Sequence, residues 1–74
     1  MSRLPVLRPQ AVLRGLQRAG FEIVRTRGSH YQLLNPTNGR RVTVPFHRQD
    51  LSRATIASIL NQAGLTAEEL LKLL

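Results

Sequence analysis

Two histidines are the side chains of this 74-residue chain best suited to proton transfer near neutral pH. His30 follows Arg27-Gly28-Ser29, and His47 follows Pro45-Phe46. Histidine is available in both its acid and its base form near neutral pH, so either residue is a candidate general acid or base. By position alone, His30 could equally be a surface residue without a role. A loop histidine such as His47 more often bonds the backbone.

The charge balance favours a polyanionic partner. Eleven Lys and Arg residues against four Asp and Glu residues give a formal net charge of +7, and all but one of the basic residues are arginine. Arginine bonds phosphate in a bidentate manner and stacks on bases, which makes nucleic acid the leading candidate. The alternative is an arginine-rich surface that reflects only genomic composition. The basic residues are spread along the chain, which argues against binding to a membrane surface.

The length and composition limit the architecture. A chain of 74 residues forms one domain with a small core, so an open surface is a better candidate for a site than an enclosed cavity. The absence of cysteine excludes disulfides, thiolate metal sites and a cysteine nucleophile. No apolar run approaches the ~18 residues of a membrane span, and no signal peptide is apparent, so we expect a cytoplasmic protein.

The elements that must position the histidines can be read from apolar spacing and breakers. Residues 1–8 are expected to be a flexible lead-in, with a single domain over residues 9–74. Val12, Leu13, Leu16 and Ala19 predict a helix over residues 9–19, which Gly20 ends.

Three segments that alternate in polarity or contain branched residues predict strands at residues 21–26, 30–34 and 40–44. Gly28 and the Asn38-Gly39 pair mark the two reversals, and Pro45 closes the last strand. These strands predict an antiparallel meander of three strands.

The alternation of side chains predicts which strand residues face the helices. Tyr31, Leu33, Val42 and Val44 are expected to face inward. The opposite, outer face is then expected to carry His30, Gln32, Arg41 and Thr43. This places His30 on an open, basic surface, which Leu34 would share.

Two further helices follow the predicted sheet. Ser52 is a candidate N-cap, Ile56, Ile59, Leu60 and Ala63 form an apolar stripe, and Gly64 ends this helix. Thr66-Ala67-Glu68-Glu69 is a capping box that opens a short last helix, with Leu70, Leu71 and Leu74 expected inward. The predicted class is α+β in two layers, with helices on one face of a three-stranded antiparallel sheet in the order α-β-β-β-α, plus a short C-terminal helix.

Four motifs occur in order along most of this chain. They are the Ala19-Gly20-Phe21 helix end, Arg27-Gly28-Ser29-His30, the segment 38–45 (NGRRVTVP) with His47 soon after, and the segment 59–65 (ILNQAGL). In these motifs the chain resembles the HicA (YcfA-like) family of mRNA interferase toxins. An N-terminal lead-in and the use of arginine where many members have lysine are modest departures from the family pattern.

The resemblance implies a fold like the double-stranded-RNA-binding domain, ribosome-independent cleavage of mRNA, and neutralisation by a HicB-type antitoxin in a hetero-oligomer. It also implies that His30, which matches the histidine of the family's Gly-Ser-His motif, is the catalytic residue.

Histidine chemistry on RNA would need no metal or cofactor, and it would leave a 2′,3′-cyclic phosphate. A single histidine with arginines and no paired carboxylates argues against two-metal nuclease chemistry. Two histidines 17 residues apart, with no cysteine, argue against a structural zinc. His47 is the secondary candidate, as a second proton-transfer group. The expected RNA-binding residues are Arg25, Arg27, Gly28, Ser29, Arg40, Arg41 and Arg48.

Two other interpretations remain open on the sequence alone. The chain could be a non-catalytic module that binds double-stranded RNA, since folds of this type bind RNA by shape without chemistry. It could also be one half of a protein complex, with its basic face covered by an acidic antitoxin, and this interpretation is compatible with a ribonuclease.

Overall fold

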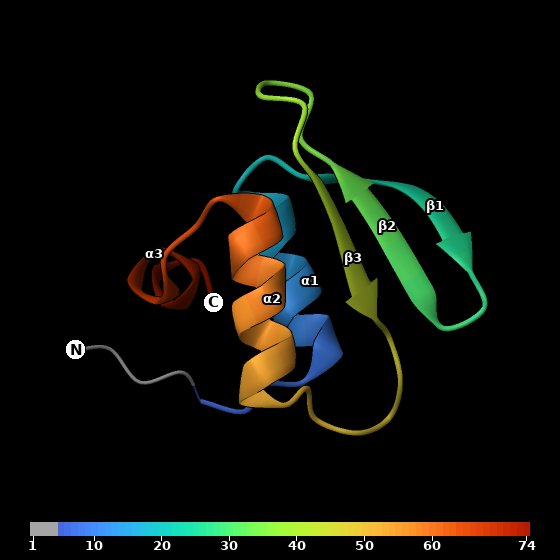
Figure 1. Ribbon diagram of the computed structural model, residues 1–74, viewed down its shortest axis with the longest axis vertical. Coiled ribbons are helices and arrows are strands. Elements are labelled where there is room, and N and C mark those ends of the chain that lie inside the picture. The colour runs from blue at the N-terminus through green and yellow to red at the C-terminus, as the bar shows by residue number, and fades with distance from the viewer. Residues whose placement is uncertain (1–4) are drawn as a thin grey trace.

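The computed structural model describes residues 5–74 as three helices and one three-stranded sheet, in the order α-β-β-β-α-α. Figure 1 shows the helices gathered on one side, with the sheet extending away from them. This confirms the predicted α+β class with an open antiparallel sheet. Residues 1–4 of the expected lead-in lie outside the described part of the chain. Leu7, near the end of that lead-in, pairs with Leu51 through a backbone hydrogen bond of 2.7 Å.

The helices begin and end at the residues that their local chemistry favours. Helix α1 (Pro9–Arg18) has proline in its first turn, where no backbone N–H is needed. Helix α2 (Arg53–Ala63) starts after Ser52, whose side chain accepts the Thr55 N–H, and ends at Gly64 with φ +71°. Helix α3 (Ala67–Lys72) opens with the predicted capping box.

The sheet contains β1 (Glu22–Arg27), β2 (His30–Leu34) and β3 (Arg41–Pro45), with β2 in the centre. The two outer strands begin and end one residue later than predicted, because residues 21–26 and 40–44 were expected to form them. Strand β1 continues to Arg27, which leaves only Gly28 and Ser29 in the turn. Strand β3 includes Pro45, which pairs with His30. The Thr43 N–H points away from β2 to the Gln62 side chain, so the N of Pro45, two residues on, faces the same way and the ladder loses no hydrogen bond.

The core lies between the helices and the inner face of the sheet. Leu33, Val42 and Val44 are buried there, as predicted, while Tyr31 is half-buried against the same cluster. The helices contribute Val12 and Leu16 from α1, and Ile56, Ile59, Leu60 and Ala63 from α2. Burial of each larger aliphatic side chain stabilises the fold by about 1.5–3 kcal/mol.

The expected inward set of the last helix was partly wrong. Leu70 is buried, but Leu71 and Leu74 are 39% and 43% exposed. A helix of six residues presents a narrow face to the core, which Ala67 and Leu70 occupy at i and i+3. Leu71 therefore turns outward, and Leu74 lies beyond the helix end.

Candidate active site

His30 stands at the tip of the β1–β2 hairpin, where the geometry of the turn exposes it. Gly28 has φ +58°, whereas Ser29 has no positive φ, a pattern that fits a type II′ hairpin turn with glycine first. A Cβ built on Gly28 would have no atom within 4 Å, so the space beside the turn is open. His30, the first residue of β2, is exposed. A large ligand can therefore approach His30 from outside.

The register of the sheet places two arginines on the same face as His30. Arg27 pairs with His30, which pairs in turn with Pro45. Two residues along each strand, Arg25 pairs with Gln32. Directly opposed residues have Cβ atoms about 4.5–5.5 Å apart, so the Arg27 and His30 side chains start as close neighbours. Both arginines are exposed.

A β-bulge determines the face on which these arginines lie. Ile23 pairs with Leu33, a buried residue of the inner face, so strict alternation would put Arg25 on the inner face too. The register shifts between Ile23 and Arg25, and the extra residue, Val24, moves Arg25 and Arg27 to the outer face. The bulge thus separates an apolar inner position from two cationic outer positions.

The loop that carries His47 is held against the start of β2. The Phe46 N–H donates to the Ser29 carbonyl, and the Phe46 ring stacks on Tyr31 with centroids 4.6 Å apart and planes 23° apart. His47 follows directly and is exposed. The structure therefore brings the backbone at His47 beside the Gly28–Ser29 turn.

The other predicted RNA-binding arginines are more scattered. Arg41 pairs with Leu34, at the opposite end of β2 from His30 and about 13 Å along the strand. Arg40 donates to the Gln62 carbonyl at the C-terminal end of α2, at 3.3 Å. Arg48 is exposed in the loop after β3. Of the predicted set, Arg25, Arg27, Gly28 and Ser29 are the residues that strand pairing and the hairpin turn place next to His30.

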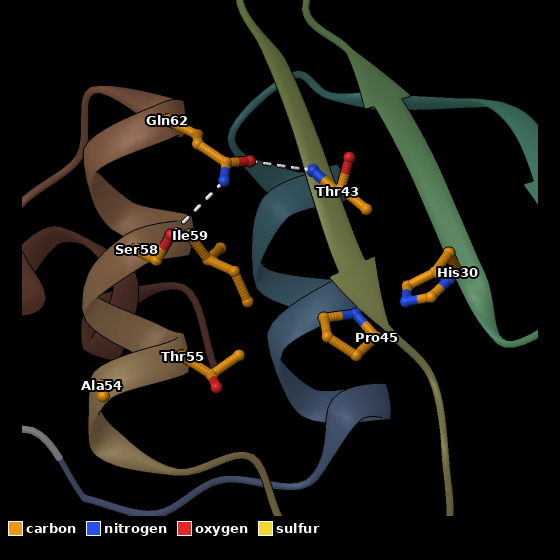
Figure 2. A pocket seen from close by; sticks show the side chains of 8 residues that line it. All are labelled: His30, Thr43, Pro45, Ala54, Thr55, Ser58, Ile59 and Gln62. Atoms are coloured by element: carbon orange, nitrogen blue, oxygen red, sulfur yellow. Dashed lines mark hydrogen bonds between the residues drawn. The ribbon is translucent and has the colours of Figure 1, made fainter.

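A groove beside His30 was not predicted from the sequence. It lies between β3 and the outward flank of α2, and His30 borders it from across β3 (Figure 2). Its remaining lining residues are Thr43, Pro45, Ala54, Thr55, Ser58, Ile59 and Gln62. Ala54, Ser58 and Gln62 recur at i, i+4 and i+8, a spacing that marks one stripe of a helix. The stripe was visible in the sequence, but the strand it faces was not.

The comparison with known families concerns most of this chain. A sequence profile described as the HicA toxin of bacterial toxin–antitoxin systems matches residues 10–65, which run from α1 to just past α2. The chain belongs to the HicA toxin family. This confirms the resemblance and gives the chain the role of a toxin with an antitoxin partner. No curated protein sequence matches the chain significantly.

The HicA-matched region contains His30, both neighbouring arginines, the bulge and the groove, whereas α3 lies outside it. Residues 5–74 of this HicA-family chain include no helix long and apolar enough to cross a membrane. The same residues contain no group of three or more His, Asp or Glu side chains arranged to hold a metal ion.

Proposed function

We propose that this HicA-family toxin is an endoribonuclease that cleaves mRNA independently of the ribosome, with His30 as its catalytic residue. The observation that carries the proposal is the cross-strand row in which exposed His30 lies beside Arg27, next to an open glycine turn. The proposal places the enzyme in the cytoplasm, where mRNA is available. A HicB-type antitoxin with an acidic surface neutralises it by covering the basic face, since complementary charge steers and fixes such complexes.

The proposed reaction is an internal transesterification. His30 accepts the proton of a ribose 2′-hydroxyl, and the 2′-oxygen bonds to the adjacent phosphorus while the bond from phosphorus to the 5′-oxygen breaks. The leaving 5′-oxygen takes a proton from water or from His47. The products are a 2′,3′-cyclic phosphate and a 5′-hydroxyl. Arg25 and Arg27 stabilise the negative charge that builds on the phosphate oxygens.

The test compares wild type, His30→Ala and His47→Ala on a labelled mRNA in the presence of EDTA. We expect His30→Ala to cut about 10²–10⁴ times more slowly while still binding RNA, because removal of a general base costs rate rather than phosphate contacts. A comparable loss in His47→Ala would assign it the second proton transfer.

Three results would contradict the proposal, and they concern the product ends, the effect of EDTA, and RNA binding without cleavage. Ends with 5′-phosphate and 3′-hydroxyl would contradict transesterification, and cleavage abolished by EDTA would contradict a metal-free reaction. RNA bound but cut by no variant would make the chain a non-catalytic binding module.

A further inference from the structure

The groove between β3 and α2 differs from the surface beside it in its charge. It has a volume of about 410 Å³, within the range of about 300–1,000 Å³ that holds small molecules. Apart from His30, its lining contains no ionisable side chain, whereas the face of β1 next to His30 carries Arg25 and Arg27. Two adjoining surfaces, one cationic and one neutral, suit two different parts of one ligand.

The groove combines apolar surfaces with fixed polar groups. Pro45 and Ala54 contribute accessible apolar carbon, while Thr43, Thr55 and Ser58 contribute hydroxyls. The Gln62 amide is held in place, because its Oε1 accepts the Thr43 N–H at 3.0 Å and its Nε2 donates to Ser58 Oγ at 3.4 Å (Figure 2). An amide nitrogen has two N–H donors, so one remains for a ligand.

These features fit a nucleobase better than a phosphate. A phosphate needs cationic partners, which the groove lacks. A base has flat apolar faces and a polar edge whose hydrogen-bond donors and acceptors can pair with the polar groups of the groove. We propose that the groove holds one unpaired base of the RNA, adjacent to the phosphate at His30, and thereby sets a base preference at the cleavage position. This inference rests on the proposed function, because it takes RNA as the ligand.

The geometry also implies single-stranded RNA at this position. A base within a duplex is stacked on both faces and has its pairing edge occupied, so it must be turned out before a groove at the edge of the sheet can hold it. The phosphates on either side remain free to contact Arg25 and Arg27 on the sheet.

The experiment titrates the four nucleoside 3′-monophosphates and inorganic phosphate into the full chain while recording backbone amide NMR spectra. Ser58→Trp fills the groove, and Ala57→Trp adds the same ring at the neighbouring exposed residue of α2, outside the groove. Thr43→Val removes one lining hydroxyl with little change of shape and serves as a second variant if Ser58→Trp fails to fold.

We expect nucleotides, but not inorganic phosphate, to shift the amide signals of Thr55, Ser58 and Gln62. One base should bind about tenfold more tightly than the weakest in wild type and in Ala57→Trp, and the ratio should fall below about twofold in Ser58→Trp. A smaller loss of preference is expected in Thr43→Val. Equal groove shifts with inorganic phosphate, or an unchanged base preference in Ser58→Trp, would overturn the inference.

A cleavage assay separates failure of this inference from failure of the proposed function. The 5′ ends of RNA cut by wild type and by the two tryptophan variants are mapped on one long transcript. Cleavage that depends on His30 but shows no base preference would retain the ribonuclease and reject the groove. If wild type binds nucleotides base-selectively in the groove but cuts no RNA, the groove is retained as a base-binding site and the ribonuclease is rejected.

Discussion

Two arginines of this chain, Arg27 and Arg40, have opposite surroundings although both are exposed. Arg27 stands in the row of His30 on the outer face of the sheet. The Arg40 guanidinium instead donates to the last turn of α2 and lies against Gly64, where a built Cβ would be 2.7 Å from it. Cations near a helix C-terminus complement its partial negative charge, which gives Arg40 a structural task.

This contrast predicts different effects of neutralising each arginine. Arg25→Gln and Arg27→Gln should each weaken RNA binding and reduce the salt dependence of the logarithm of affinity by about 0.7, the value of one lost phosphate contact on a single strand. Arg40→Gln is the matched control and should change the slope little. Binding isotherms at several salt concentrations measure this. An equal loss of slope in Arg40→Gln would show that its guanidinium reaches phosphate.

At the residue scale, the sequence was informative where a residue type has few uses. His30 could be singled out because few side chains transfer protons near neutral pH, and the motif around it gave it a role. The arginines could be named only as a set. Their separation into a group beside His30 and distant members depends on strand register and on where α2 ends.

At the scale of elements, the bulge in β1 controls the placement of the arginines. Ile23 and Val24 both favour strands, so no alternation in the sequence marks Val24 as the extra residue. The caps behaved differently, because Ser52 and the Thr66–Glu69 pair signal helix starts through hydrogen bonds within a few residues. Local chemistry was therefore predictable, whereas the bulge and the groove depend on contacts between distant segments.

Two single-residue deletions in β1 test whether strand register decides the face on which Arg25 lies. Each deletion removes the extra residue of the bulge, but only one of them changes the partner of Arg25. Deleting Val24 leaves Ile23 opposite Leu33 and Arg25 opposite Gln32, so RNA affinity should stay within about twofold. Deleting Thr26 keeps Arg27 at the turn but moves Arg25 opposite Tyr31, on the inner face. We expect the second deletion to weaken RNA binding about as much as Arg25→Gln. Equal affinities of the two deletion variants would argue against control by register.

At the scale of the whole molecule, α3 is joined to the core from two sides. Leu70 is buried in the common core, and Arg18 of α1 donates to the Leu73 carbonyl at 2.6 Å. A Cβ on Gly15 of α1 would be 2.8 Å from Leu70, so the two helices are in close contact. These contacts indicate that α3 unfolds together with the rest of the domain.

The capping box makes this cooperativity measurable through pH. The Thr66 N–H donates to Glu69 Oε1 at 2.8 Å, and together with the Thr66 hydroxyl it lowers the pKa of Glu69 below its usual 4.5. A carboxyl whose pKa is lower in the folded than in the unfolded chain stabilises the fold at pH values above its unfolded-state pKa. This stabilisation is lost as the pH falls through its folded-state pKa. Glu69→Gln should therefore lower Tm at pH 7 and differ less from wild type at pH 3. A difference in Tm that is unchanged by pH would contradict the charged cap, and no difference at pH 7 would mean that α3 melts separately.

Strand β1 lies at the edge of the sheet with all six residues exposed, including the apolar Ile23 and Val24. An exposed, apolar edge strand is a template on which identical chains can pair and aggregate. Arg25 and Arg27 put like charges along that edge, so two copies approaching edge to edge repel each other. The two arginines that we assign to phosphate thus also protect the chain from self-association. Their neutral variants should be kept dilute, because the same substitutions remove that protection.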